Sequence, residues 1–465
     1  MHNPQQQHAL MAQTQASTPL TLTPALQDMA SSATLAMNEA VAARRAAGRK
    51  TIHLGFGEAS FPLHPLLAEA MARAAKRTGY APVAGIPALR KAIAAYLERT
   101  RHITFTPDQI IAAPGSKPLL YTLLQALDGD LLLPVPSWVS YAPQARLAGR
   151  RVIEVETDAR DHHRLTPQAL SDALVRARQE GANPRILIVN TPSNPTGSMF
   201  SAEDAQAIAN WSREHGITLI SDEIYAELAH GWREHVSPAQ FYPEGCIVTG
   251  GLSKAFSAGG WRLGYAAIPG NNAAGKQLMA AVHALASEIW SSATTPVQEA
   301  AAVAYSPNVE LASYVKAAAR IHGYVVSRLY EMLTNAGALC PRPAGGFYLY
   351  PDFTPWREAL LERGVATSEQ LAHYLLDEWD IATLPGSAFG EQPQALRLRL
   401  ATSMLYTPEE AHTENERDAA LWQLLAQAGR WTEGKPESGQ TLEMPALEHT
   451  QARLGEFVGS LEKSH

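Results

Sequence analysis

Cysteine is almost missing from this sequence, and long apolar runs are missing altogether. Only Cys246 and Cys340 occur among 465 residues, too few for a disulfide framework or a cysteine-based zinc site. No run of about 18 or more apolar residues is present, so a membrane span is not expected. The first residues, 1–7, lack the basic start and apolar core of a signal peptide. We therefore expect a cytoplasmic protein without a metal site.

Charge is also modest. Charged residues make up 18% of the chain and the formal net charge is -7, which argues against a general nucleic-acid binder. Apolar residues make up 46%, as in an ordinary globular enzyme. A chain of this length can bury a large core and should form two or three domain-sized units.

Apolar strand-like runs alternate with helical patterns through the first half of the chain. Strands are expected at 109–112, 131–133, 151–155, 185–189, 217–220, 247–248 and 264–268. Helices are expected between most of them, for example at 167–180 after Thr166 and at 202–214 after Ser201. This alternation predicts an α/β fold whose central sheet is mostly parallel and covered by helices on both faces. Functional groups should then gather at the carboxyl ends of the strands.

Composition shifts divide the chain into five parts. A Gln-, Thr- and Pro-rich extension at 1–27 is expected to be disordered, and 28–60 is expected to form an arm that belongs in part to a small domain. The large domain is placed at 61–310 and a smaller α+β domain at 311–429, joined by an Ala-rich helix. The last part, 430–465, is expected to be a polar tail.

One lysine, Lys254, has unusual neighbours. It follows the apolar run 246–248 within a segment of small residues and hydroxyls, and a second cation, Arg262, comes later in that segment. Desolvation and nearby positive charge favour a neutral, nucleophilic amine. We predict that Lys254 forms a Schiff base with pyridoxal phosphate.

Two segments that follow strands fit the phosphate and the ring of such a cofactor. Residues 114–118 lie between a strand and a helix, where free backbone N–H groups would cradle a phosphate; a bare turn is the alternative. Trp138 lies just past a strand end, where its indole could stack on a flat ring; core packing is the alternative.

Two further segments supply hydrogen-bonding groups. Asn194 follows the strand at 185–189 as a donor at the sheet edge, although its Asn-Pro context also forms turns. Asp222 ends an apolar strand, where a carboxylate is costly unless paired, and a protonated pyridine nitrogen is a suitable partner. A helix N-cap is the alternative for Asp222. Tyr225 could reach the phenolic oxygen of the same ring.

In this order and spacing, these segments resemble the class I/II aminotransferases, pyridoxal-phosphate enzymes of fold type I that are similar to aspartate aminotransferase. The resemblance covers about residues 28–428. The matching motifs are 194–197, 221–225, 253–254, 260–264, 343–348 and 397–403. It implies an enzyme that moves an amino group between an L-amino acid and a 2-oxo acid by a ping-pong mechanism.

The resemblance also implies the roles of the catalytic residues. Lys254 would carry the cofactor and shuttle the proton, and Asp222 would pair with the pyridine nitrogen. Asn194 and Tyr225 would hydrogen-bond the ring oxygen.

The remaining cofactor contacts follow from the same motifs. Trp138 would stack on the ring. The residues that would hold the phosphate are Gly115, Ser116, Ser253 and Arg262. Tyr80 resembles a tyrosine that reaches the phosphate of the neighbouring subunit, which implies a homodimer with shared active sites.

The resemblance gives three substrate contacts in addition to Asn194. Arg397 corresponds to the arginine that binds the substrate α-carboxylate; Arg399 is close by, and strand alternation places both on one face. Gly57 would let the backbone approach the substrate. Lys117 matches a lysine that binds the distal carboxylate in aspartate/prephenate-type relatives, which favours an acidic donor; an ordinary lysine in a first helical turn is the alternative.

Two other functions are compatible with this family. One is a lyase or cyclase of a modified amino acid on the same fold. The other is the effector domain of a regulator, for which the 27 residues ahead of the fold are too few to form a winged-helix domain. We expect an enzyme of amino acid metabolism that acts on amino acids and 2-oxo acids. No nucleic acid or membrane is expected as a partner.

Overall fold

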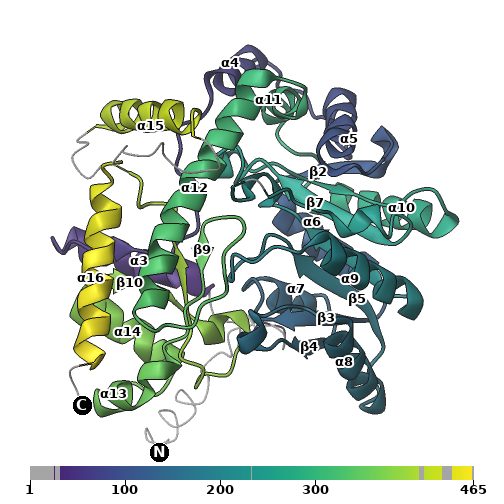
Figure 1. The fold of residues 1–465 in the computed structure, drawn as a ribbon. Coiled ribbons are helices and arrows are strands. Elements are labelled where there is room, and N and C mark those ends of the chain that lie inside the picture. Colours follow the sequence, from purple (N-terminus) through teal and green to yellow (C-terminus); the bar gives the residue numbers. More distant parts are fainter. Residues whose placement is uncertain are drawn as a thin grey trace, which may run out of the picture.

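The computed structural model describes residues 23, 26, 32–231, 233–407, 413–431 and 442–462. The predicted disordered extension at 1–27 lies outside these ranges apart from residues 23 and 26. The described chain folds into a large domain around a seven-stranded sheet and a smaller domain of short strands and helices (Figure 1). A long helix, α12 (Val309–Asn335), runs between the two.

The seven-stranded sheet has the order β2-β8-β7-β6-β5-β3-β4. Its strands are β2 (Ile110–Ala113), β3 (Asp130–Val135), β4 (Val152–Glu156), β5 (Pro184–Asn190), β6 (Thr218–Asp222), β7 (Cys246–Gly251) and β8 (Gly264–Ala267). Only β8 runs antiparallel, to both β2 and β7, and the other pairings are parallel. The predicted mostly parallel sheet is confirmed, with each strand within a few residues of its expected position.

Both faces of this sheet are buried. Along β5, Ile186 and Ile188 enter the core on one face, whereas Leu187 and Val189 enter the core on the other. The first face is covered by α6 (Ser116–Ala126), α7 (Tyr141–Leu147) and α10 (Ala273–Ile289). The second is covered by α5 (Pro87–Arg101), α8 (Pro167–Gln179), α9 (Ala202–His215) and α11 (Thr295–Tyr305). Continuous apolar strands are what a sheet buried on both faces requires.

Local signals account for several helix boundaries. The Thr166 hydroxyl accepts a hydrogen bond from the Ala169 amide at the start of α8. At the start of α9, Ser201 and Asp204 form a reciprocal capping box, and α9 ends at Gly216 in the left-handed conformation, φ 66°. These caps satisfy backbone groups that a helix end leaves without partners.

The smaller domain contains two small sheets. β11 (Leu384–Pro385), β12 (Leu398–Ala401) and β9 (Tyr348–Leu349) pair antiparallel, while β1 (Ile52–His53) pairs parallel with β10 (Ile381–Ala382). The helices outside the large domain are α3 (Ala33–Ala46), α13 (Arg357–Glu362), α14 (Ser368–Trp379), α15 (Glu414–Ala428) and α16 (Pro445–Glu462), whereas α4 (Pro65–Ala74) packs on α11 of the large domain. The N-terminal arm thus joins the small domain through β1.

The predicted polar tail at 430–465 contains a packed helix instead. α16 buries five apolar side chains in the small-domain core: Leu447, Leu454, Phe457, Val458 and Leu461. They recur at helical spacing, so they share the face that packs on α12 and α13. The polar composition of the preceding stretch, 432–441, hid this pattern, and that stretch lies outside the described residues.

Candidate active site

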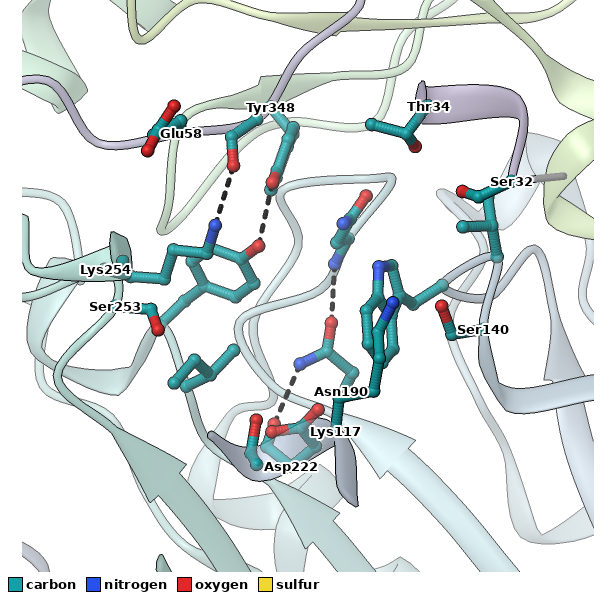
Figure 2. Close-up of a pocket in the computed structure, with 18 of the residues that line it drawn as sticks. Ser32, Thr34, Glu58, Lys117, Ser140, Asn190, Asp222, Ser253, Lys254 and Tyr348 are labelled. Atoms are coloured by element: carbon teal, nitrogen blue, oxygen red, sulfur yellow. Dashed lines mark hydrogen bonds between the residues drawn. The ribbon is translucent and has the colours of Figure 1, made fainter. Parts of the chain in front are cut away.

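A pocket of about 390 Å³ opens at the carboxyl ends of the parallel strands. Its walls come from the large domain, from the small domain and from the first residues of α3 (Figure 2). Of the predicted site residues, those that line it are Gly57, Ser116, Lys117, Trp138, Asn194, Asp222, Tyr225, Ser253, Lys254 and Arg262. The sheet therefore brings together side chains that are far apart in the sequence.

Lys254 presents its amine to this pocket from the turn after β7. Its Nζ donates a hydrogen bond to the Gly57 carbonyl oxygen at 2.7 Å (Figure 2). Burial lowers the Lys254 pKa to about 8, with Arg399 and Arg262 adding to the effect and Glu58 opposing it. Desolvation disfavours the charged amine, so the neutral, nucleophilic form is reached more readily than in an exposed lysine.

Asp222 ends β6 on the floor of the pocket and is 3% exposed. Its Oδ2 accepts a hydrogen bond from the Tyr141 hydroxyl at 2.7 Å, and its Oδ1 accepts one from the Thr249 hydroxyl at 3.1 Å. Burial raises the Asp222 pKa, and these hydrogen bonds oppose that rise. A buried carboxylate held by hydroxyls can accept a cationic group of a ligand.

Tyr225 and Asn194 face the same space. The Tyr225 and Tyr348 hydroxyls are hydrogen-bonded at 2.8 Å. Asn194 is 4% exposed and its Oδ1 has no hydrogen-bond partner within the described chain. Buried polar atoms are seldom left without a partner, so this side chain is available to hydrogen-bond a ligand. The Asn190 side-chain oxygen accepts a hydrogen bond from the backbone amide of Asn194 at 2.7 Å, which helps to hold this residue in place.

The start of α6 forms a cradle for an anion. Gly115 precedes the helix with φ 101°, and a Cβ there would lie 2.5 Å from Arg262 Nη2. A Cβ on Gly264 would lie 2.3 Å from the Ser116 amide nitrogen. Glycine is thus required at both positions for the backbone, the helix N-terminus and Arg262 to converge. Free N–H groups and the helix dipole favour a phosphate at this place.

Trp138 and Lys117 form the adjoining wall. Lys117 Nζ lies 5.0 Å from the centroid of the Trp138 ring. Burial, and then the charge of Arg262, lower the Lys117 pKa. The Trp138 ring also meets Tyr141 edge-on at 5.1 Å between centroids. Trp138 therefore packs against a site residue while lining the pocket, so packing and ring stacking are compatible here.

The structure corrects the choice between the two arginines near β12. Arg397 pairs with Asp352 at 2.9 Å and with Glu391, and it does not line the pocket. Arg399 does line it, is 2% exposed, and donates to the Gly55 carbonyl oxygen at 2.5 Å. Two carboxylates already neutralise Arg397, whereas the guanidinium of Arg399 remains available to a ligand.

Two other predicted residues lie outside the pocket lining. Gly115 shapes the cradle from behind Arg262, as described above. Tyr80 is 96% exposed and does not reach the pocket of its own chain.

Sequence reasoning missed several residues of the pocket. Tyr141 lies in the segment of Trp138, and Tyr348 lies in the motif 343–348, so both were within reach of the motif argument. Ser32 and Thr34 had no such signal, because they lie at the start of a helix rather than after a strand. Only the fold places them at the pocket (Figure 2).

Neither a metal centre nor a membrane helix is found among the described residues. Within those ranges, His, Cys, Asp and Glu side chains do not gather in groups of three that could hold a metal ion. No helix there has the length and apolar character needed to cross a membrane.

The chain belongs to the class I and II aminotransferase family. Residues 49–410 match the family model "Aminotransferase class I and II". The chain is 37% identical over 382 residues to the aspartate aminotransferase of Geobacillus stearothermophilus, covering 80% of this chain and 92% of that one. It is 34% identical to the aspartate/prephenate aminotransferase of Thermus thermophilus, covering 81% and 94%.

Solved structures agree with this assignment. The aspartate aminotransferase from Thermus thermophilus with maleate superimposes with a TM-score of 0.74 at 32% identity, covering 88% of this chain and 100% of that one. The predicted fold type I, transaminase activity and pyridoxal phosphate cofactor are thereby confirmed.

Proposed function

We propose that this transaminase acts on an acidic L-amino acid, of the aspartate or glutamate type, with a 2-oxo acid as the second substrate. The observation that carries the proposal is a pocket lined by two cationic groups besides the reactive amine and Arg262 that could bind two carboxylates: Arg399 from the small domain and Lys117 from α6. The aspartate aminotransferases among its relatives favour the same substrate class.

Arg399 is proposed to bind the α-carboxylate. Its side chain is buried, its Nε has no partner within the described residues, and its guanidinium lies 5.0 Å from the Tyr348 ring centroid. Burial lowers the Arg399 pKa, and the neighbouring Tyr348 and Tyr225 oppose that effect. A carboxylate would give this buried cation the partner that the protein does not supply.

The distal carboxylate is proposed to bind on the opposite wall. Lys117 supplies a cation there, and Ser32 and Thr34 supply hydroxyls from the start of α3. Figure 2 shows Ser32 and Thr34 across the pocket from Lys254. Charge-assisted hydrogen bonds from this wall would select an acidic side chain over an apolar one.

The residues of the pocket fit the cofactor in a definite orientation. We assign the phosphate to Gly115, Ser116, Ser253 and Arg262, the pyridine nitrogen to Asp222, and the ring face to Trp138. Asn194 and Tyr225 are assigned to the ring oxygen. When bound, pyridoxal phosphate supplies an electron sink for the charge that develops on the substrate α-carbon.

Lys254 is proposed to move the proton. Its Nζ, with a pKa near 8, would remove the substrate α-proton in its neutral form and deliver that proton to the cofactor carbon, so that the amino group can be transferred. The Gly57 carbonyl oxygen accepts a hydrogen bond from the amine and holds it in the pocket, while the carboxylate of Asp222 would keep the pyridine nitrogen protonated. The two substrates use one pocket in turn, which is the ping-pong mechanism predicted from the sequence.

We also propose a cytoplasmic homodimer with shared active sites. Tyr80 is exposed and does not line the pocket of its own chain, as expected of a residue that serves a second copy. α10 also supports a subunit interface. Its residues are mostly apolar, yet only Val282 and Ala286 among them are buried within the single chain. Both cysteines are free and buried, which fits a reducing compartment. Sedimentation of the purified protein at twice the chain mass would support the dimer.

An absorbance titration tests the substrate assignment. Purified protein loaded with pyridoxal phosphate is mixed with single L-amino acids, and loss of the visible cofactor band is followed. Aspartate and glutamate are expected to convert the band at concentrations at least about tenfold lower than alanine or leucine. The Lys254→Ala variant serves as the control that retains the pocket but cannot transfer the proton.

Two results would contradict the proposal. Equal conversion by apolar and acidic amino acids would remove the assigned distal site. Steady release of pyruvate or ammonia from one amino acid, without a 2-oxo acid, would indicate a lyase on the same fold.

A further inference from the structure

The segment that carries Asp222 and Tyr225 also carries two carboxylates that point away from the pocket. Glu223 directly follows Asp222 and its side chain is 1% exposed; Glu227 lies four residues further on and is 14% exposed. Two buried like charges on one short segment repel each other and are costly to desolvate. Some group must hold them in place.

That group is Arg101, the last residue of α5. Its Nε lies 3.2 Å from Glu223 Oε2 and its Nη2 contacts Glu227 Oε1. The Arg101 side chain is itself only 4% exposed. The fork geometry of a guanidinium lets one cation reach both carboxylates, which a lysine ammonium cannot do in the same way.

Hydroxyl groups complete this cluster. Glu223 Oε1 accepts hydrogen bonds from the hydroxyls of Ser221 at 2.9 Å and Ser237 at 2.5 Å. Glu227 Oε1 accepts one from the Tyr96 hydroxyl at 2.6 Å. His235 Nδ1 lies 3.9 Å from Glu223 Oε2, and burial keeps the His235 pKa well below its ordinary value. The neutral imidazole leaves Arg101 as the cation of the cluster.

The helix that bears Arg101 is well anchored, whereas the segment it holds borders a cavity along part of its length. α5 packs against α11 and β2 in the large-domain core. On the other side, Glu227 and Ala229 border a second cavity, of about 870 Å³, between α5 and α12. Without Arg101 the segment would have room to move toward that cavity.

We infer that Arg101 is a positioning residue for transamination: through Glu223 and Glu227 it holds the segment 222–227, and so fixes the positions of Asp222 and Tyr225 in the pocket. The inference rests on the proposed function only for its effect on catalysis. The mechanical part, a cation that immobilises the segment, holds for the protein without cofactor as well.

Hydrogen exchange on the cofactor-free protein tests the mechanical part. Three amides report on the segment: Glu223, bonded to the Thr249 carbonyl, Ala226, bonded to that of Glu223, and Leu228, bonded to that of Tyr225. In Arg101→Met and Arg101→Lys, these amides are expected to exchange at least about tenfold faster, while those of α9 are unchanged. Unchanged exchange at 222–228 in both variants would overturn the inference.

Kinetics and absorbance of the loaded enzyme test the catalytic part. Arg101→Lys is expected to lower kcat about 10- to 100-fold, because displacement of catalytic groups by about 1 Å has effects of that size, while KM changes less than about threefold. The pH midpoint of the visible band is expected to shift as Asp222 and Tyr225 move. Arg99→Lys is the matched control: Arg99 lies on α5 and stacks on Tyr96, but its hydrogen bonds go to backbone carbonyls.

The outcomes separate the two hypotheses. If Arg101→Met does not fold, Arg101→Lys and Glu227→Gln decide the question, because each weakens the ion pairs between Arg101 and the two carboxylates. Faster exchange with an unchanged kcat and band midpoint would show a purely structural role and overturn the positioning. An enzyme that fails to transaminate any amino acid would refute the proposed function, while the exchange result would still stand by itself.

Discussion

Arg397 and Arg399 are only two residues apart in the sequence, yet the charges of their neighbours differ. Carboxylates of Asp352 and Glu391 pair with Arg397, whereas a backbone carbonyl and aromatic rings surround Arg399. Sequence alone could place both on one face of a strand. It could not show which guanidinium had already found its counter-ions, since those come from distant segments.

Conservative substitutions should separate the roles of these arginines. Arg399→Lys is expected to reduce kcat/KM for an acidic amino acid by about 10- to 100-fold, because a bidentate charged contact to the α-carboxylate is lost. Arg397→Lys, the control, is expected to change kcat/KM less than about threefold and to lower the melting temperature slightly. Steady-state kinetics with both variants decide the matter, and the reverse order of effects would restore Arg397 as the substrate arginine.

Residues that follow strands were the most predictable part of the site. Asn194, Asp222 and Lys254 each come after an apolar run, and parallel strands bring their carboxyl ends to one edge. Ser32 and Thr34 show the limit of that reasoning. They reach the pocket because the arm that contains them folds back onto the small domain, a tertiary contact that leaves no local pattern in the sequence.

Elements were predicted where periodicity was strong. The strands of the large sheet read clearly because burial on both faces demands continuous apolar residues. α16 was missed for the converse reason. Its apolar stripe is spread over 18 residues that also include polar residues, alanine and glycine. Average composition hides such a stripe, whereas the spacing of its apolar residues would have shown it.

Packing of α16 should contribute measurably to stability. Phe457 is fully buried and its ring meets those of Phe353 and Trp379 at 5.8 and 5.6 Å between centroids. Phe457→Ala is expected to lower the free energy of unfolding by about 3–5 kcal/mol, the usual cost of such a cavity. Glu456→Ala, which removes an exposed ion pair with Arg453 on the same helix, should cost less than about 1 kcal/mol. Urea unfolding of both variants provides the measurement, and equal losses would mean that α16 is not part of the core.

At the scale of the whole molecule, buried histidines set the response to acid. Burial lowers the pKa of His53, His163 and His230 to about 4 and that of His322 to about 3. The unfolded chain binds protons at these groups below about pH 6.5, but the folded chain does not. The stability they support is therefore complete above about pH 6.5 and is lost as the pH falls toward 4.

His322 offers a direct test of this pH dependence. Its ring lies among Phe61, Phe347 and Tyr406, and neither of its nitrogens has a hydrogen-bond partner within the described residues. His322→Phe is expected to reduce the slope of unfolding free energy against pH by up to roughly 1.4 kcal/mol per unit between pH 6.5 and 4. Buried carboxylates such as Glu223, whose pKa is raised, act in the opposite direction and are the same in both proteins. An unchanged slope in urea titrations would refute the assignment.

The position of Ser32 and Thr34 has a consequence for where the substrate choice of this chain can be changed. The stretch that matches the family model begins at residue 49, yet these two hydroxyls of the proposed substrate wall lie ahead of it. Lys117 and Arg399, the proposed cations, lie within it. A change confined to the leading stretch would therefore alter the distal wall while both cations and every residue assigned to the cofactor stay as they are.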